Sequence, residues 1–371
     1  MIDNDSGNIK LEHGAGGEEM HELLKLMLRY FNFTNANASN NSNKWAKAVI
    51  DVPLKALDDS AVVDNIVFTT DSHTVKPLFF PGGDIGSLSI AGTVNDIAVM
   101  GAEPLCLSVA FVIEEGFPIT DFERLLESMK KTCEDAEVAV VTGDTKVVER
   151  GAVERIIVNT SAIGRRTEAL EKNMEEVRRY RELAGNWLID SNLRDGDSII
   201  VSGYLGDHGI ALLSFREGFE FDTGLQSDIA PLNRTIHEVL NVGGVVAMKD
   251  LTRGGLANSL NEFSLKSNVG ILIEEDKIPV RESVRNACEL LGIDQLEIGN
   301  EGKLVMGVVK EKASDVLHAL WRTKHGKDAA IIGSATEKLG AKKLKGVVMK
   351  TQVGGMRIVE TPIGDPVPRI C

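Results

Sequence analysis

Cysteine is scarce in this sequence, and the four residues present form neither a metal-binding nor a disulfide pattern. They are Cys106, Cys133, Cys288 and Cys371, without a CxxC pair or a Cys/His cluster. This spacing argues against structural zinc and against a disulfide framework. Cys133 and Cys288 fall on the apolar stripes of helical patterns, and Cys106 lies in the apolar run LCLSVAFVI, so we expect all three to be packing residues. Cys371 differs because it is the last residue of the chain.

Long apolar runs and dense blocks of basic residues are also missing. The longest apolar stretch, around 105–113, is far shorter than the roughly 20 residues that cross a bilayer, and the N-terminal MIDNDSGNIK lacks a signal-peptide pattern. The formal net charge is −14 and no Lys/Arg block offsets it, which disfavours nucleic acid as a partner. We therefore expect a cytoplasmic protein that binds neither nucleic acid nor membrane. An acidic protein can still bind a nucleotide through magnesium.

The two common glycine-rich nucleotide motifs are absent as well. Neither GxxxxGK[ST] nor GxGxxG occurs, so a P-loop or a Rossmann dinucleotide site has no support in the sequence. Any phosphate group must be held by other residues.

The length and composition indicate a folded chain of two domains. With 371 residues, 43% hydrophobic and 26% charged, the chain exceeds a single core of about 150 residues. Strands and helices alternate without a strict βαβ repeat, which favours an α+β fold of two layered domains whose mixed or antiparallel sheets are covered by helices. We expect an N-terminal domain at 1–165, a charged connecting segment at 166–192, a second domain at 193–359 and a flexible Pro-rich tail at 360–371.

Three local patterns in the first domain make specific predictions. Residues Glu18 to Phe31 carry apolar side chains at helical spacing, which predicts an amphipathic helix. The stretch 32–43, NFTNANASNNSN, is polar and of low complexity, which predicts an inserted surface loop. Thr120 and Glu123 match a capping box at the start of another helix.

Aspartates recur beside Gly, Ser or Thr where predicted strands end, and one more lies in a helical pattern. They are Asp59, Asp71, Asp144 and Asp250, joined by Asp96 from the helix. Carboxylates at strand ends can converge on a hard cation, and magnesium prefers oxygen ligands while bridging to substrate phosphates. Each aspartate taken singly is compatible with a turn or a cap. Lys146 and Arg253, close to these blocks in the sequence, are cations that could pair with phosphate.

The sequence blocks resemble those of one protein family. They are HGAGG, LDDSAVV, TTDSHTVKPLFFPGGDIG, AGTVNDIAVMGAEP, VTGDTKVV, VSGYLGDHGIAL, DLTRGGLANSLNE, GNEGK and the terminal PVPRIC. Together they span nearly the whole chain and resemble the HypE family of hydrogenase maturation proteins, within the aminoimidazole-ribonucleotide-synthetase-like ATP-binding superfamily. The aspartate blocks indicate the superfamily, whereas FFPGGDIG and PRIC are the parts most specific to the family. The Asn-rich stretch and the long charged connection depart from the family pattern.

The resemblance implies an enzyme that acts on its own C-terminus. In this family the terminal cysteine, here Cys371, receives a carbamoyl group from a HypF-type carbamoyltransferase. ATP then drives dehydration of the thiocarboxamide to a thiocyanate, whose cyanide passes to the iron of the nickel-iron hydrogenase centre. A HypC/HypD-type assembly complex is the further partner. The resemblance also implies ATP and Mg²⁺ as cofactors and a homodimer with nucleotide held near the subunit interface.

The same resemblance assigns roles to individual residues. The residues implied to hold magnesium are Asp59, Asp96 and Asp250. Those implied to bind the nucleotide are Asp59, Asp71, Asp96, Gly143, Asp144, Thr145 and Arg253. The catalytic candidates beside Cys371 are Lys146, Glu262 and Glu301. A charged Lys146 could stabilise the phosphoryl group, and a desolvated neutral one could accept a proton.

Two other interpretations remain open at this level. Another ATP-dependent synthetase or kinase of the superfamily would use the same aspartates. A selenophosphate synthetase would carry a reactive Cys and Lys after HGAG, where this chain has Gly17, Glu18 and Glu19. Alternatively, a non-catalytic carrier or scaffold would only present Cys371 to partners. A tail extended at about 3.3 Å per residue is long enough to reach a partner and return to its own site.

Overall fold

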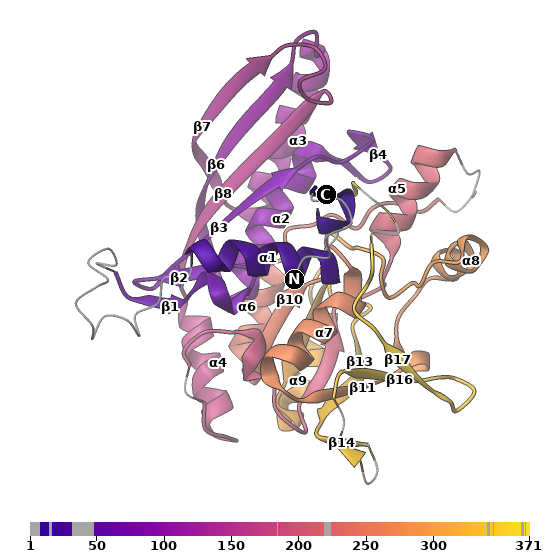
Figure 1. Cartoon of the computed structure of the whole chain (residues 1–371). Helices are drawn as coiled ribbons and strands as arrows, with labels where there is room; N and C mark the ends of the chain where they lie inside the picture. Colours follow the sequence, from indigo (N-terminus) through magenta and orange to yellow (C-terminus); the bar gives the residue numbers. More distant parts are fainter. Residues whose placement is uncertain are drawn as a thin grey trace.

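The structure is a computed structural model of the whole chain, and it describes residues 8–14, 17–31, 48–183, 185–218, 224–339, 342–343, 345–364, 367 and 369–371. Two large sheets form, one in each half of the chain, with helices packed on them (Figure 1). Within the described ranges, no helix is long and apolar enough to cross a membrane. The Asn-rich stretch 32–43 lies outside the described residues, so its predicted loop stays a prediction.

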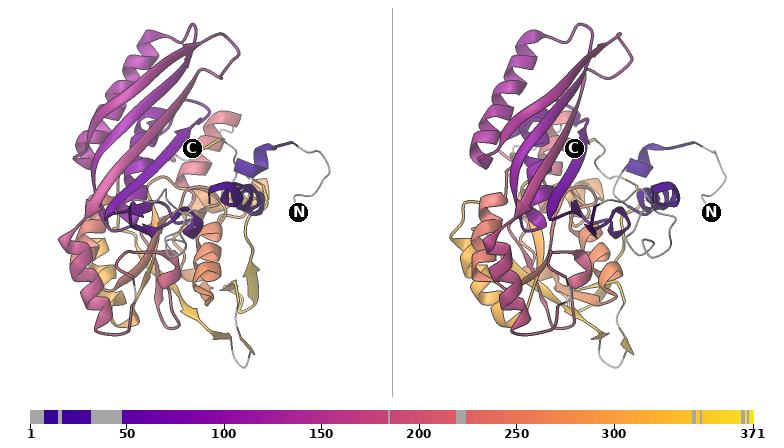
Figure 2. Two further views of the ribbon diagram at one scale, coloured as in Figure 1. Left: turned by 60° about the vertical axis from the view of Figure 1, so that its left-hand side comes forward. Right: turned by 90° about the vertical axis from the view of Figure 1, so that its left-hand side faces the viewer.

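The N-terminal sheet has six strands in the order β1-β2-β3-β8-β6-β7. Its neighbouring strands are antiparallel except β6 and β7, which run parallel. The strands are β1 (Ile50–Val52), β2 (Ala61–Val63), β3 (Ile66–His73), β6 (Ala102–Glu114), β7 (Ala139–Val148) and β8 (Ile156–Arg166), with a separate hairpin of β4 (Phe79–Phe80) and β5 (Gly83–Asp84). Helices α2 (Ile85–Val99) and α3 (Ile119–Ala136) cover one face of this sheet (Figure 2).

Helix α2 is buried along almost its whole length because it is apolar on nearly every side. A capping box fixes its N-terminus: the Ser87 backbone N–H donates to the Asp84 carboxylate at 2.9 Å, and the Asp84 N–H donates to the Ser87 hydroxyl at 3.1 Å. Near its other end, the Asn95 side chain donates to the Ala230 carbonyl at 3.1 Å and accepts from the Leu232 N–H at 2.8 Å. The helix therefore joins the N-terminal sheet to the second half of the chain.

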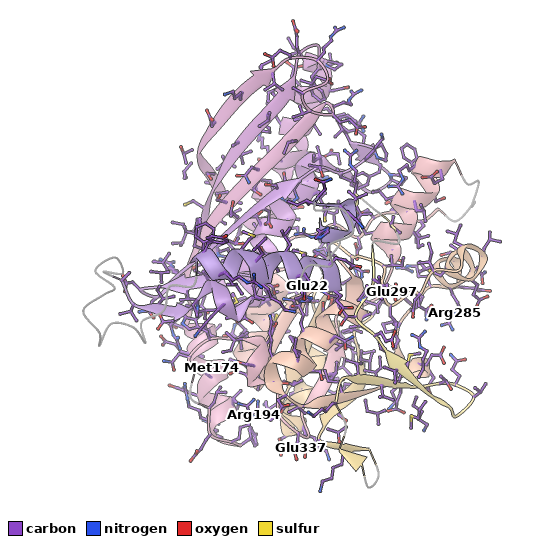
Figure 3. All side chains as sticks on the ribbon, in the orientation of Figure 1. Glu22, Met174, Arg194, Arg285, Glu297 and Glu337 are labelled. Atoms are coloured by element: carbon purple, nitrogen blue, oxygen red, sulfur yellow. The ribbon has the colours of Figure 1, made fainter. Side chains whose placement is uncertain are left out.

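The C-terminal sheet has seven strands in the order β10-β12-β9-β13-β11-β16-β17, of which only β11 and β16 run parallel. The strands are β9 (Ser198–Val201), β10 (Val245–Asp250), β11 (Gly270–Glu274), β12 (Leu304–Val308), β13 (Ala330–Thr336), β16 (Val347–Lys350) and β17 (Met356–Val359), with a small hairpin of β14 (Lys338–Leu339) and β15 (Lys342–Lys343). The helices are α4 (Glu168–Arg178), α5 (Asp207–Glu217), α6 (Asn233–Val242), α7 (Gly255–Ser267), α8 (Glu282–Leu291) and α9 (Ala313–Trp321). Arg194 and Glu337 lie at the end of this domain away from the N-terminal sheet (Figure 3).

The predicted fold class is confirmed, because both sheets are mixed and helices pack on them. The helix predicted at Glu18–Phe31 is α1, with those bounds. The predicted capping box of Thr120 and Glu123 is wrong. Helix α3 begins at Ile119 with Pro118 as its N-cap and without a side-chain cap bond. Thr120 is therefore already inside the first turn, where its hydroxyl can no longer act as the cap.

One continuous apolar core joins the two halves of the chain. Val94 of α2 and Leu304 of β12 share this core with Val367 and Ile370, close to the C-terminus. The tail is therefore docked on the protein in this structure. A docked conformation does not test whether the tail is mobile, so its mobility stays a prediction. The domain boundaries also stay a prediction.

The three internal cysteines lie where packing residues are expected. Cys288 is buried, and Cys106 and Cys133 are partly buried, all three as free thiols. Burial is the main cause that raises the pKa of the Cys133 and Cys288 thiols to about 11, which makes both weak nucleophiles at neutral pH.

Candidate active site

A cavity of about 490 Å³ lies between the N-terminal sheet and the C-terminal domain. Its walls come from the start of α1, the segment before β2, the end of β3, the end of β10 and the start of α7. Figure 1 shows α1 crossing in front of this junction, with the C-terminus close by. The structure brings together at this cavity the predicted site residues Asp59, Asp71, Asp96, Asp250, Arg253, Glu262, Glu301 and Cys371.

Three aspartates of the cavity are buried close enough to repel each other's charge. Burial first, and neighbouring carboxylates second, raise the pKa of Asp96 well above its usual range. The same causes raise the pKa of Asp250 to about 8. Burial also raises the pKa of Asp59 to about 6, although Lys249 opposes the shift. The Thr69 hydroxyl donates to Asp96 Oδ2 at 2.8 Å and holds that carboxylate in place. A cation among these groups would reduce their repulsion.

These aspartates could bind magnesium only together with ligands from water and from a nucleotide. In the part of the chain that the structure describes, no three His, Cys, Asp or Glu side chains form a group that could hold a metal ion. Asp59, Asp96 and Asp250 are therefore not a cage made by protein alone. Magnesium, however, keeps several waters and is commonly bound by one or two carboxylates together with substrate phosphates. The donor set fits Mg²⁺ that arrives with a nucleotide.

Two lysines that the sequence analysis did not single out line one side of this carboxylate cluster. Lys249 Nζ lies 2.5 Å from Asp59 Oδ1 and 3.0 Å from Glu262 Oε2. Lys266 Nζ lies 2.7 Å from Asp190 Oδ2 and 3.5 Å from Glu262 Oε2. Burial opposes the charge of both lysines, but the carboxylates outweigh it and raise their pKa. The sequence VVAMKD could have indicated a role for Lys249. A lysine in a strand pattern that is otherwise apolar is expected to be buried, and a buried lysine needs a charged partner.

Arg253 and Glu301 contribute the charge near the end of the chain. The charge at Cys371 is the largest cause that raises the pKa of the Arg253 guanidinium. Glu301 is almost fully buried. Burial first, then the carboxylates of Asp250 and Asp228, raise its pKa well above the usual range. Its Oε1 has no hydrogen-bond partner among the described residues. A carboxyl group in this environment keeps its proton to a higher pH than an exposed glutamate does.

Asp71 and His73 stand at the end of β3, on the wall that meets α2. The Thr93 hydroxyl donates to Asp71 Oδ2 at 2.8 Å. His73 Nε2 lies 3.2 Å from Thr160 Oγ1, and burial is the main cause that lowers the pKa of this imidazole to about 4. Asp71 and His73 both line the cavity, and the lowered pKa of His73 favours its neutral form.

The C-terminal tail reaches this cavity by pairing with the chain just after β3. The Thr74 N–H donates to a main-chain oxygen of Cys371 at 3.4 Å, and the Lys76 N–H donates to the Arg369 carbonyl at 3.1 Å. The Arg369 side chain donates back to the Thr74 carbonyl at 3.1 Å and pairs with Glu154. The terminal residue is thereby placed among the aspartates that the sequence analysis proposed for the nucleotide.

The predicted GDTK segment, 143–146, does not line the cavity of its own chain. It lies on β7, an exposed edge strand. Asp71, Thr160, Val109 and Gly143 form one row across the sheet, so Gly143 lies three strand spacings, about 14 Å, from Asp71. A Cβ on Gly143 would stand 2.0 Å from the Val109 carbonyl oxygen, which gives this glycine a packing role.

The fold and the cavity define a known class of protein. The sequence families described as AIR synthase related protein, N-terminal domain, and AIR synthase related protein, C-terminal domain, match residues 57–166 and 194–342. A thiamine-monophosphate kinase from Stenotrophomonas maltophilia, 20% identical, covers 88% of this chain with a TM-score of 0.57 and shares the fold. The two halves are therefore the two AIR synthase-related domains.

Full-length relatives narrow the class to one family. Carbamoyl dehydratase HypE of Escherichia coli is 40% identical over 98% of this chain and 99% of its own. A Methanocaldococcus jannaschii protein provisionally named as a hydrogenase expression/formation protein is 48% identical over 97% of this chain and 98% of its own. A crystal structure of hydrogenase maturation protein HypE in complex with ATP covers 98% of this chain and 100% of its own, at 39% identity and a TM-score of 0.74. The chain belongs to the HypE family.

Proposed function

We propose that this chain is an ATP-dependent carbamoyl dehydratase that acts on its own carbamoylated Cys371 and supplies the cyanide ligand of the nickel-iron hydrogenase. The observation that carries the proposal is that Cys371, the last residue, lines the same cavity as Asp59, Asp71, Asp96 and Asp250. The name of the E. coli relative, carbamoyl dehydratase, and a HypE structure solved with ATP support it. The cytoplasmic location predicted from the sequence is part of this proposal.

The chemistry converts the thiocarboxamide on Cys371 and ATP into a thiocyanate, ADP and phosphate. The amide oxygen attacks the γ-phosphorus, and the bond between that phosphorus and the ADP oxygen breaks. The carbon–oxygen bond then breaks with phosphate as the leaving group, while the two protons on nitrogen are removed and the nitrogen electron pairs form the C≡N bond. Phosphorylation is needed because an amide oxygen is otherwise a poor leaving group. Water is not a reactant in this conversion, and water that reached the phosphorylated intermediate would hydrolyse it.

We assign the proton acceptor to Glu301 in preference to Glu262. Glu301 Oε1 has no hydrogen-bond partner in the described chain, and burial raises the pKa of this carboxyl group. Glu262 instead contacts Lys249 and Lys266, and these lysines hold its pKa below the usual range in spite of burial. A carboxylate with a raised pKa is the better base for a weakly acidic N–H group. Glu262 then serves to hold the two lysines.

Binding of the nucleotide is assigned to the aspartates and to Arg253. Asp59, Asp96 and Asp250 would hold Mg²⁺, which when bound neutralises charge on the transferred phosphoryl group. Arg253 precedes α7 and lines the cavity together with Cys371, a position from which a guanidinium can pair with phosphate oxygens. Asp71 faces the same cavity from β3.

We further propose that two copies of the chain complete the site through β7. This strand is exposed along nearly its whole length, and Val140, Val141 and Val147 are among its exposed apolar side chains. An edge strand of this kind invites pairing with another chain. Lys146 does not line the cavity of its own chain. A second copy that packs on β7 would give this lysine a role in the active site of that copy.

The partner that carbamoylates Cys371 is proposed to be a HypF-type carbamoyltransferase. A crystal structure of a HypE–HypF complex, 43% identical and covering 88% of this chain and 98% of its own with a TM-score of 0.76, supports this choice. A HypC/HypD-type complex is proposed as the acceptor of the cyanide.

Intact-mass analysis tests the function directly. The protein, the carbamoyltransferase, carbamoyl phosphate and Mg-ATP should give first a carbamoyl adduct and then the loss of one water. Cys371→Ala should bind ATP but give neither product, because alanine offers no nucleophile. A carbamoyl adduct that never loses water in the presence of ATP would support the carrier interpretation instead. Thiocyanate formed in Cys371→Ala would refute the terminal-cysteine mechanism.

A further inference from the structure

Two of the sequence blocks that resemble the family, FFPGG and GDHG, have no role in the chemistry above. The structure places the second block against the docked C-terminus and the first block against the second. Phe80 of the first block stacks edge-on against His208 of the second, with ring centroids 5.7 Å apart and planes at 83°. His208 lies in the first turn of α5 and is completely buried. His208 itself is not among the residues that line the cavity.

Both ring nitrogens of His208 are hydrogen-bonded. Nε2 lies 2.9 Å from the carbonyl oxygen of Ile370, and Nδ1 lies 2.7 Å from the hydroxyl of Ser227. A carbonyl oxygen can only accept, so a proton must be on Nε2, and in the neutral ring the Ser227 hydroxyl then donates to Nδ1. The Ile229 N–H donates to Ser227 Oγ at 3.3 Å. This contact uses a lone pair of the hydroxyl and leaves its proton to donate to Nδ1. Burial also lowers the pKa of His208, which favours this neutral tautomer.

The serine that orients the ring is itself fixed by the first block. The Ser227 N–H donates to the Pro81 carbonyl at 2.8 Å. A Cβ on Gly82 would lie 2.7 Å from the backbone of Ser227, and Gly82 has a φ of +90°, so glycine is required there for the close approach. The block therefore holds Ser227, and Ser227 holds the tautomer of His208.

The side chain of Ile370 has a matching place on the protein. It is buried, and a Cβ on Gly299 would lie 2.5 Å from its Cδ1 and 2.8 Å from the Thr252 carbonyl oxygen. Gly299 thus leaves the space that Ile370 fills. The isoleucine side chain and the His208 hydrogen bond fix the same residue, and Cys371 is the residue that follows it.

We infer that His208 is a positioning residue for the dehydration step: it holds the carbonyl of Ile370 and so keeps the modified Cys371 at the aspartates and Glu301. Because the contact is made to the backbone next to Cys371, it does not depend on what the sulfur carries. It acts after the partner has transferred the carbamoyl group, when the tail must remain in its own cavity. The inference rests on the proposed function for its catalytic consequence, but the docking itself can be measured without it.

The first experiment measures docking by alkylation of Cys371 with iodoacetamide, without nucleotide or partner, followed by mass spectrometry of the C-terminal peptide. His208→Leu removes the donor and leaves the Ile370 carbonyl unpaired, so alkylation of Cys371 should be about fivefold to tenfold faster. Cys288 in the same sample reports on the fold and should be unchanged. In His208→Gln the amide N–H can still donate, and the rate should return toward that of the parent protein. The exposed His237 of α6 provides the matched control, His237→Leu, which should leave Cys371 unchanged.

Unchanged alkylation of Cys371 in His208→Leu, with Cys288 still protected, would overturn the inference. If this variant exposes Cys288 and so fails to fold, His208→Phe decides the question. It keeps an aromatic ring against Phe80 and removes the donor to the Ile370 carbonyl, so Cys371 should again react faster while Cys288 stays protected. An unchanged rate in a folded His208→Phe protein would refute the role of His208.

The second experiment measures the two catalytic steps separately by intact mass. In His208→Leu the carbamoyl adduct should still form, whereas its conversion to thiocyanate should slow by about the same factor as the alkylation accelerates. An equal fall in both steps would refute a role in positioning for dehydration. Failure of the parent protein to form thiocyanate would instead refute the proposed function, and it would leave the alkylation result standing.

Discussion

Lys249 on β10 and Asp59 before β2 form an ion pair of 2.5 Å although 190 positions separate them in the chain. Both side chains are nearly buried, at 9% and 12% exposure. The pair joins the N-terminal domain to the C-terminal sheet at the wall of the cavity. Because Lys249 also contacts Glu262, its loss would remove the cation that pairs with Asp59 and one of the two lysines that contact Glu262.

We predict that Lys249→Met lowers the free energy of unfolding by about 3 kcal/mol at neutral pH, since removing one partner leaves buried charge uncompensated. Urea titration followed by circular dichroism measures the change. Lys131→Met, at an exposed position of α3, is the control and should stay within about 0.5 kcal/mol of the parent protein. Equal midpoints for the two variants would show that the ion pair contributes nothing to stability.

Asp96→Asn and Asp250→Asn should each weaken the magnesium binding on which ATP turnover depends. Each change removes one anionic oxygen from a site whose remaining ligands come from water and nucleotide. Turnover of the carbamoylated protein at increasing Mg²⁺ should show a midpoint raised about tenfold or more, with an unaltered circular dichroism spectrum. Asp276→Asn, at an exposed position, is the matched control. If both variants behave like this control, neither aspartate is a ligand.

The proposed dimer can be tested at the centre of the exposed strand β7. Val141 is 63% exposed there, and Val141→Asp would place a charge in an apolar contact between copies. Sedimentation velocity should show a dimer for the parent protein and a monomer for the variant, and turnover should fall because Lys146 lies on the same strand. Val353→Asp, at a 95% exposed position outside the sheets, should remain dimeric. A monomeric parent protein would contradict this part of the proposal.

His325 should make stability depend on pH. Burial first, then Lys324 and Lys303, lower the pKa of this imidazole to about 4. Between pH 6.5 and 4 the unfolded chain therefore binds the proton more strongly, and stability falls as the pH falls. His325→Gln should reduce this fall by at most about 1.4 kcal/mol per pH unit, the limit for one proton.

Urea midpoints measured from pH 7 to pH 4.5 give the slope for each protein. The exposed His237, replaced by glutamine, is the control and should keep the slope of the parent protein. The buried His73 and His208 are shifted in the same direction and remain in every variant, so part of the slope persists. Identical slopes for His325→Gln and the parent protein would refute the assignment.

The carboxylate character of the site could be predicted because strand-end aspartates are a local feature of the sequence. Asp59, Asp71, Asp96 and Asp250 line one cavity, and Arg253 and Cys371 join them. The position of segment 143–146 could not be predicted in this way. Its residues carry the right chemistry, but sheet order puts β6 and β8 between β7 and β3, and that order is set by packing between distant segments.

The sequence alone determined the periodicity that makes α1 and the mixed α+β layers, the excess of acidic residues, and a terminal cysteine at the end of a proline-rich segment. These properties depend on side chains a few positions apart. Only the tertiary structure decided that Lys249 pairs with Asp59 and that His208 holds the carbonyl of Ile370. Such contacts join residues more than a hundred positions apart, and they form because burying a charge or a polar group is stable only where folding brings its partner to it.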